Sequence, residues 1–141
     1  MNLKIQKKNG NAIIPKYQTS GSAGFDFHST IKTVVSAGET KLIPTGIAME
    51  IPIGFEVQVR PRSGLSLKTG IRVANAPGTI DSDFRDEIMV ILYNQGPLPF
   101  EISVGDRIAQ GVVCPVIQAD FIEVNGLSNT ERKGGFGSTG K

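Results

Sequence analysis

The sequence has no tryptophan, one cysteine and one histidine among its 141 residues. The single cysteine, Cys114, excludes a disulfide framework within one chain. The single histidine, His28, leaves little material for a zinc site or a Ser-His-Asp triad. No apolar stretch is long enough to cross a bilayer, and the first residues lack the apolar segment of a signal peptide. We therefore expect no membrane association and a soluble protein of a reducing compartment, either the cytoplasm or, for a eukaryotic or viral source, the nucleus.

Charge of one sign is also scarce, because 15 basic and 13 acidic residues give a formal net charge of only +2. These charges are interspersed, and no block of like charge would follow a nucleic-acid backbone. We therefore expect no nucleic-acid partner. With one histidine present, hydrolytic chemistry would depend on carboxylates and Mg²⁺. Cys114 stands in an apolar run, where a lone thiol is more often a small core residue than a nucleophile.

Seventeen glycines and eight prolines cut the chain into short segments, which leaves little room for helices. The length fits one domain, and the composition predicts an all-β fold. Apolar and polar residues alternate strictly over residues 55–60, which is typical of a strand with Phe55, Val57 and Val59 on one face. Further strands are predicted at residues 3–7, 23–29, 41–43, 46–51, 99–102 and 119–124. Residues 63–70 have room for one short helical turn.

Two segments, residues 87–93 and 108–117, are almost continuously apolar. Such runs predict strands that are buried on both faces. A sandwich that packs its second face against another subunit would explain them, and so would a well-filled jelly roll alone. We favour an obligate oligomer.

The last ten residues, 132–141, contain one aromatic side chain, Phe136, among glycines and hydroxyl residues. This composition cannot bury enough apolar area to fold alone. The cations and hydroxyls suit phosphate oxygens, and the ring offers a face for a base to stack on. We therefore predict a β core over residues 1–127 and a flexible arm over residues 128–141 that closes on a nucleotide. The alternative is an ordinary disordered tail.

Two internal segments also carry chemistry. Residues 61–64 follow the alternating strand and offer backbone N–H groups, a hydroxyl and a guanidinium to a phosphate chain. Residues 75–87 place a tight turn before a cluster of acids that could supply a general base or bind a metal ion. Taken alone, each segment is more often an ordinary polar turn or a solvated acidic loop.

Taken in order, five segments resemble the five motifs of the trimeric dUTP pyrophosphatases, or dUTPases. They are residues 23–26, 61–71, 75–88, 105–110 and 132–140. The resemblance runs through nearly the whole chain. It implies a jelly-roll subunit with a flexible C-terminal arm, a homotrimer with active sites shared between subunits, and Mg²⁺-dependent cleavage of dUTP to dUMP and pyrophosphate. Such an activity limits uracil incorporation into DNA and supplies dUMP for thymidylate synthesis.

The same resemblance implies a role for each matched residue. Asp81 would activate the attacking water, and Asp26 would act on Mg²⁺ indirectly, through water. The nucleotide would be bound by a larger set: Arg62, Ser63, Gly64 and Gln110 on the phosphates; Asn75, Gly78, Thr79, Ile80, Asp81 and Met89 in a hairpin that reads uracil; Phe84 under the deoxyribose; and Arg132, Phe136, Gly137, Ser138 and Thr139 in the closing arm.

The sequence departs from the family pattern at three places. Phe84 replaces a usual tyrosine, Asp86 replaces a usual glycine, and the spacing from Arg132 to Phe136 is one residue shorter. Two other hypotheses remain open: a related dCTP deaminase, and a non-catalytic β-sandwich that kept only the fold. The sequence around Asp81 favours water attack on phosphorus over deamination.

Overall fold

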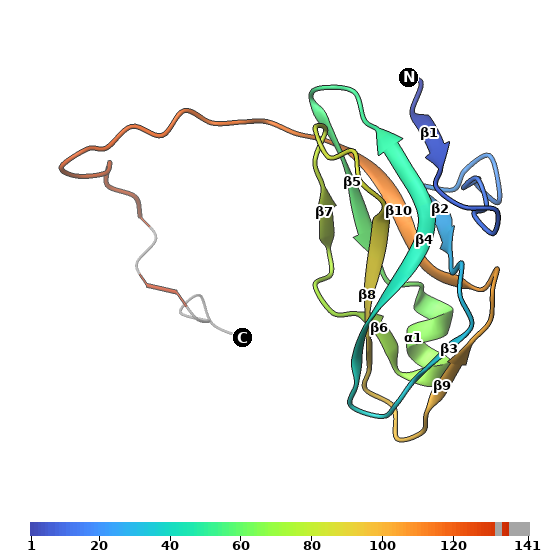
Figure 1. The fold of residues 1–141 in the computed structure, drawn as a ribbon. Helices are drawn as coiled ribbons and strands as arrows, with labels where there is room; N and C mark the ends of the chain where they lie inside the picture. The colour runs from blue at the N-terminus through green and yellow to red at the C-terminus, as the bar shows by residue number, and fades with distance from the viewer. Residues whose placement is uncertain (132–133, 136–141) are drawn as a thin grey trace.

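A computed structural model describes residues 1–131 and 134–135 of the chain, mostly as β-strands with one short helix (Figure 1). The elements in chain order are β1 (Lys4–Lys7), β2 (Gly24–His28), β3 (Thr33–Val35), β4 (Thr40–Glu50), β5 (Phe55–Arg60), α1 (Ser63–Thr69), β6 (Ile71–Val73), β7 (Gly78–Ile80), β8 (Ile88–Asn94), β9 (Phe100–Ile102) and β10 (Arg107–Pro115). The prediction of a mostly β fold is confirmed, and the predicted helical turn is α1.

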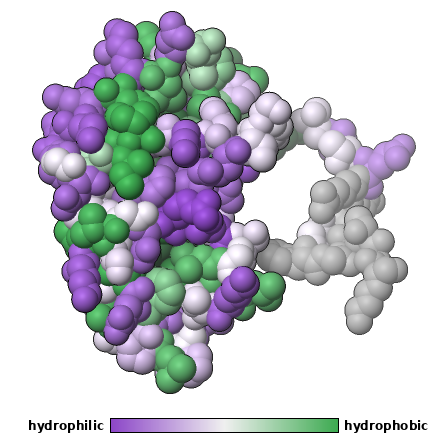
Figure 2. Space-filling view, turned by 90° about the vertical axis from the view of Figure 1, so that its right-hand side faces the viewer, coloured by the Kyte–Doolittle hydropathy of each residue, from purple (hydrophilic) through white to green (hydrophobic). Residues whose placement is uncertain are grey.

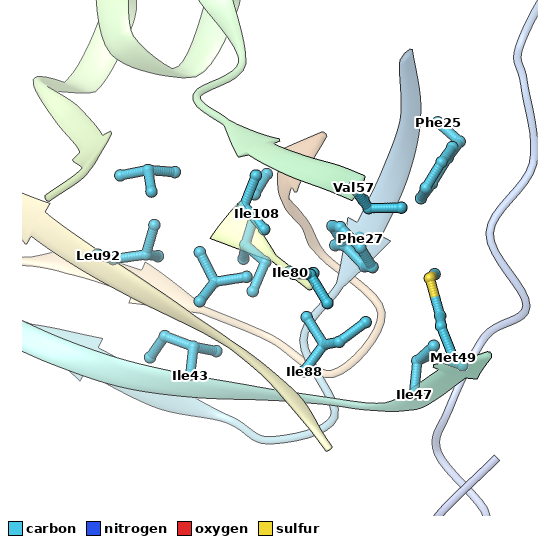
Figure 3. Close-up of a cluster of buried hydrophobic side chains, with 14 of the residues drawn as sticks. Phe25, Phe27, Ile43, Ile47, Met49, Val57, Ile80, Ile88, Leu92 and Ile108 are labelled. Atoms are coloured by element: carbon cyan, nitrogen blue, oxygen red, sulfur yellow. The ribbon is translucent and has the colours of Figure 1, made fainter. Parts of the chain in front are cut away.

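The strands form two four-stranded sheets, with orders β1-β4-β8-β6 and β2-β10-β5-β7, and one two-stranded sheet, β3-β9. Every pairing is antiparallel. Apolar side chains from both larger sheets meet in the core, where Phe27, Val57 and Ile108 face Ile43 and Leu92 (Figure 3). Removal of this apolar area from water is the main favourable contribution to folding.

The core follows the alternation of each strand. In β5, Val57 and Val59 are buried, as the sequence predicts. In β8, Ile88, Val90 and Leu92 are buried, whereas Met89 on the opposite face is 39% exposed. Within one chain this run is buried on one face only, and the predicted packing of its second face against another subunit stays a prediction.

The other apolar run, in β10, is likewise not fully buried within one chain. Val112, Val113 and Cys114 on its later part are only half-buried. Cys114 is thus not the core residue that the sequence predicts, and its thiol lies 3.7 Å from Nη2 of Arg60. The outer faces of both runs remain accessible in one chain.

Most predicted strands are confirmed with ends shifted by a residue or two. The predicted strands at residues 41–43 and 46–51 are instead one strand, β4, interrupted by a bulge where Pro44 pairs with Met89 and Ile47 with Ile88. From the sequence, the proline and glycine in this stretch suggest that one strand ends and another begins. In the structure Gly46 has φ of 68°, and the strand continues through the bulge. Strands β3, β6 and β7, of three residues each, were not predicted.

The strand predicted at residues 119–124 does not form. After β10, residues 116–131 contain no strand and run away from the body of the protein (Figure 1). Phe121 is 98% exposed and Leu127 is 89% exposed. A strand exists only with a partner for its N–H and C=O groups, and none lies beside this segment within the described part of the chain.

The surface seen from the side of β1 and β3 alternates in character. Hydrophobic residues form several separate patches there, with hydrophilic side chains between them (Figure 2). Among the described residues, no helix is long and apolar enough to span a membrane.

Candidate active site

Three segments that are far apart in the sequence line one polar pocket. The pairing of β2 with β10 sets Asp26 opposite Gln110, and the pairing of β10 with β5 sets Gln110 opposite Arg60. The chain leaves β5 at Arg60 and enters α1 at Ser63. The pocket is lined by Gln18, Ser22, Ala23, Gly24, Asp26, Arg62, Ser63, Gly64, Arg107 and Gln110. The residues predicted on the phosphates, together with Asp26, therefore lie together.

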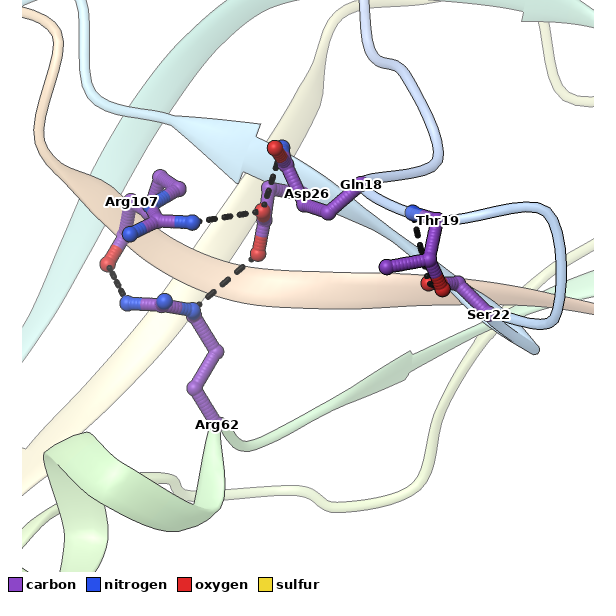
Figure 4. A network of polar contacts seen from close by, with 6 residues as sticks. All are labelled: Gln18, Thr19, Ser22, Asp26, Arg62 and Arg107. Atoms are coloured by element: carbon purple, nitrogen blue, oxygen red, sulfur yellow. Dashed lines mark hydrogen bonds and ion pairs between the residues drawn. The ribbon is translucent and has the colours of Figure 1, made fainter.

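Asp26 is the centre of the polar contacts in this pocket, and its residue is only 8% exposed (Figure 4). Its Oδ1 lies 3.0 Å from Nε of Arg62, and its Oδ2 lies 3.3 Å from Nη1 of Arg107. Nε2 of Gln18 donates a further hydrogen bond to Oδ2, at 3.0 Å. A buried carboxylate needs such partners. The network holds two guanidinium groups at the pocket wall.

Two further hydrogen bonds fix the shape of the pocket. Nη1 of Arg62 donates to the carbonyl oxygen of Arg107 at 3.1 Å, and Nε2 of Gln110 donates to the carbonyl oxygen of Pro61 at 2.9 Å. Gly24 has no side chain in the space that Gln110 occupies, since a Cβ there would lie 2.5 Å from Oε1 of Gln110. The turn that carries Arg62 is thus tied to β10.

The start of α1 contributes hydrogen-bond donors. Arg62 is the N-cap residue and makes no side-chain cap hydrogen bond, and no acidic residue lies in the first turn. The first N–H groups of a helix have no partner within the helix. Ser63 and Gly64 therefore present amide groups and a hydroxyl at the pocket, beside the Arg62 side chain.

His28 lies next to this network, at the end of β2 opposite Arg107. Burial lowers the pKa of His28, and the positive charges of Arg107, Arg62 and Lys16 lower it further, against an opposing effect of Asp26. Within the described residues its Nδ1 is buried without a hydrogen-bond partner. Burial and the neighbouring cations therefore favour the neutral form of the ring.

A second group of predicted residues lines a different pocket. Thr79, Ile80, Asp81, Phe84, Ile88 and Met89 form this hollow between the end of β7 and the start of β8. Phe84 and Met89 are each 39% exposed, so an apolar surface is open to a ligand. The Asn75 side chain lies against Gly78, where a Cβ would be 3.1 Å from Nδ2 of Asn75.

Residues 81–87 form the loop that carries Asp81 and Phe84. The Phe84 amide donates to the Asp81 carbonyl oxygen at 3.2 Å. Nη1 of Arg85 donates to the carbonyl oxygens of Ser82 and Phe84, at 2.6 and 3.0 Å. The loop is therefore held in shape by its own hydrogen bonds.

The two groups lie at opposite ends of strand β5. Ile80 pairs with Val57, which is three residues back along β5 from Arg60, the last residue of that strand. At about 3.3 Å per residue this is about 10 Å, and Asp81 and Arg62 lie beyond the two ends of that span. Within one chain, Asp81 and the Asp26 pocket therefore face different sites.

No group of three His, Cys, Asp or Glu side chains converges on a metal-sized site in the described part of the chain. Asp26 is the only acid that lines its pocket. Mg²⁺ in nucleotide enzymes takes most of its ligands from phosphate oxygens and water, with one or two carboxylates. The single carboxylate of this pocket fits an ion that takes its other ligands from phosphate oxygens and water. The acids of residues 75–87, which the sequence offered as a second possible metal site, do not converge on one point in the described part of the chain.

Five of the predicted site residues, Arg132, Phe136, Gly137, Ser138 and Thr139, lie outside the described residues. Conversely, Gln18 and Arg107 contact Asp26 but were not singled out from the sequence. Arg107 lies within the fourth motif, three residues before Gln110. A positive charge so close to a predicted binding residue could have identified Arg107 from the sequence. Gln18 stands in an irregular segment and has no such signal.

A sequence model of the dUTPase family matches residues 10–140. The chain is 59% identical over 142 residues to the deoxyuridine 5′-triphosphate nucleotidohydrolase of Nautilia profundicola, covering 100% of both. It is 51% identical over 141 residues to the enzyme of the same name from Helicobacter pylori strain J99, covering 99% of this chain and 97% of that protein. The chain belongs to the dUTPase family. It is accordingly an enzyme that hydrolyses dUTP, a dUTP diphosphatase.

The fold agrees with this membership. The dUTPase of Staphylococcus bacteriophage 80alpha, solved with dUPNHPP, has a TM-score of 0.92 and 26% sequence identity and covers 99% of this chain and 98% of its own. The prediction of a jelly-roll subunit of this family is confirmed.

Proposed function

We propose that the enzyme cleaves dUTP between the α- and β-phosphates by direct attack of water. The water oxygen forms a bond to the α-phosphorus as the bond to the bridging oxygen breaks, and pyrophosphate leaves. Asp81 accepts the proton of the attacking water as general base. Its place at the rim of an open pocket, beside the exposed Phe84 and Met89, supports this role. The products are dUMP, a precursor for thymidylate synthesis, and pyrophosphate.

The Asp26 pocket is proposed to bind the triphosphate. The guanidinium of Arg62, the Ser63 hydroxyl and the amide groups of Ser63 and Gly64 are donors suited to phosphate oxygens. Gln110 holds this turn through the Pro61 carbonyl oxygen. The Asp26 ion pairs with Arg62 and Arg107 are the observation that carries the proposal, because they gather positive charge at a polar pocket.

Mg²⁺ would be held by the triphosphate and water, with Asp26 accepting hydrogen bonds from that water. When bound, the ion would neutralise phosphate charge as pyrophosphate departs. Asp26 suits this indirect role, since both of its oxygens already accept from protein donors. The pocket itself contributes no other carboxylate among its lining residues.

Base and sugar recognition are proposed for the second pocket. The backbone of the turn that contains Asn75, Gly78, Thr79 and Ile80 would read the uracil edge, together with Met89 on the return strand. Phe84 would lie under the deoxyribose and leave no room for a 2′-hydroxyl. The dUTPase of phage 80alpha was solved with dUPNHPP, which supports a deoxyuridine nucleotide as the ligand of this fold.

We further propose a homotrimer in which each active site combines residues of different subunits. Asp81 and Arg62 lie beyond opposite ends of a span of about 10 Å along β5 and line different pockets of one chain, which favours a site completed by a second subunit. A partner subunit can supply the missing half. The arm, including Arg132, Phe136, Gly137, Ser138 and Thr139, would close over the nucleotide.

Exposed apolar side chains support association between subunits. Leu42 in β4 is 51% exposed and pairs with Ile91 in β8, next to the exposed Met89. Phe121 and Ile122 beyond β10 are 98% and 80% exposed. Large exposed apolar side chains grouped in this way are typical of a protein interface. As for the location of the enzyme, the bacterial source of these relatives favours the cytoplasm over the nucleus.

A trimer predicts a mass of three times 15.1 kDa in solution. Light scattering coupled to size exclusion measures it directly, at concentrations down to those of the activity assay. Activity should fall when dilution dissociates the trimer, because each site would lose residues from a partner. A monomer that keeps full activity would contradict the shared site.

The reaction is tested by incubating the enzyme and Mg²⁺ with dUTP, dTTP, dCTP or UTP, and by measuring pyrophosphate and ammonia. We expect pyrophosphate from dUTP, little from the other three, and no ammonia. Removal of divalent ions with a chelator should abolish the reaction, and added Mg²⁺ should restore it. Ammonia from dCTP would support the deaminase hypothesis, and turnover that is insensitive to chelation would contradict the Mg²⁺ requirement.

A further inference from the structure

The loop of residues 81–87 joins the two larger sheets of the fold. It leaves β7, at the edge of the sheet β2-β10-β5-β7, and enters β8, inside the sheet β1-β4-β8-β6. The hydrogen bonds described above lie within the loop and tie it to no other element. The position of Asp81 and Phe84 relative to the body therefore depends on where the loop ends are attached.

The attachment at the β8 end is made by side chains at the bulge of β4. Oε1 of Glu87 accepts a hydrogen bond from the Gly46 amide at 2.7 Å. The Thr45 hydroxyl donates to the carbonyl oxygen of Ile88 at 2.6 Å, and Thr45 is only 1% exposed. The first bond gives a partner to the amide of Gly46, which the bulge leaves without a paired residue in β8. The second is made at Ile88, which pairs with Ile47 directly beside the bulge.

The bulge itself cannot shift easily. Gly46 has φ of 68°, a conformation that favours glycine. A Cβ at this position would lie 2.7 Å from Cβ of Ala12 and 2.8 Å from Cγ2 of Thr30. The Gly46 carbonyl oxygen also accepts from the Lys8 amide at 2.8 Å. The Gly46 amide is thus a fixed donor on the body of the protein.

We propose that Glu87 is a positioning residue for the nucleotide loop. Its carboxylate fastens the last residue of the loop to the fixed Gly46 amide, and so sets the distance of Asp81 and Phe84 from the bound nucleotide. The inference rests on the proposed roles of Asp81 and Phe84. Glu87 itself is not proposed to touch the substrate. Asp86, next to it, makes no hydrogen bond or ion pair with any described residue, so the attachment belongs to Glu87 alone among the loop acids.

The test compares Glu87→Ala with Glu87→Gln, because the glutamine amide oxygen still accepts from Gly46 whereas alanine cannot. We expect Glu87→Ala to lower kcat/KM for dUTP by about 10- to 100-fold, with KM raised, since small misplacements of catalytic groups have effects of this size. Glu87→Gln should stay within about 3-fold of the wild type. The ratio of UTP to dUTP hydrolysis should also rise in Glu87→Ala, because Phe84 would no longer be held under the sugar.

Three further variants separate the possible outcomes. Glu101→Ala removes an exposed carboxylate on β9 and should leave all parameters unchanged. Phe84→Ala should raise the rate of UTP hydrolysis relative to that of dUTP. If this ratio does not rise, another residue selects the sugar. The KM and kcat of Glu87→Ala for dUTP then decide the role of Glu87. If Glu87→Ala does not fold, Glu87→Asp, one methylene shorter, should lose about 10-fold against Glu87→Gln.

A merely structural role gives a different result. If Glu87→Ala melts at a lower temperature while KM and the UTP to dUTP ratio stay at wild-type values, Glu87 stabilises the fold and the proposal is overturned. Equal kinetics for Glu87→Asp and Glu87→Gln would overturn it as well.

Discussion

Replacing Asp81 with asparagine should lower kcat for dUTP by about 10²- to 10⁴-fold, the usual effect of removing a general base. Asparagine keeps the shape of the side chain but cannot accept the proton of the attacking water. Binding should change little, because the proposed phosphate contacts lie in the other pocket, around Arg62. Rapid-mixing kinetics with dUTP and equilibrium binding of dUPNHPP measure the two effects separately.

Asp83→Asn is the matched control for this experiment. Asp83 lies in the same loop, is exposed, and has no hydrogen bond or ion pair with any described residue. The same chemical change should therefore leave kcat within about 3-fold of the wild type, as expected of a surface substitution. Near-normal turnover in Asp81→Asn would show that another group activates the water.

Deletion of residues 132–141 should lower kcat/KM by about 10- to 100-fold. Stacking of a base on an aromatic ring contributes roughly 1–3 kcal/mol, and the deletion removes Phe136 together with the proposed phosphate contacts of Arg132, Ser138 and Thr139. It would also open the site to water. Steady-state kinetics on dUTP measure the loss, and Phe136→Ala should produce a smaller part of it.

The core should remain folded in the shortened protein. The clustered core residues all come before residue 110, and β10 ends at Pro115. Thermal unfolding should therefore occur at nearly the same temperature as in the full chain. Unchanged dUTP hydrolysis would rule out a closing arm, and loss of the folded trimer would assign the segment a structural role.

Much of the fold was predictable because strands leave a local signal. The alternation of Phe55, Val57 and Val59 predicted β5, and density of glycine and proline predicted an all-β chain. The predicted break before Gly46 failed for a physical reason. The positive φ of Gly46 belongs to a bulge within a paired strand. Glycine and proline are typical of bulges as well as of turns, so composition does not distinguish the two.

The candidate site was predictable only in part. The motifs identified Asp26, Arg62 and Gln110, which the structure brings into one pocket. They did not identify Arg107 as a partner of Asp26. That contact joins residues 81 positions apart in the sequence, and the bulge that shifts the register between β10 and β2 lies directly beside it.

The sequence by itself determined the class of fold, the order of the motifs and the family, because periodicity and motif residues are local properties of the chain. Only the tertiary structure decided which groups meet: the two arginines on Asp26, the Glu87 carboxylate on the Gly46 amide, and the separation of Asp81 from Arg62 along β5. Strand register sets these relations, and register depends on how whole sheets pack their buried faces together. No local pattern in a single segment contains that information.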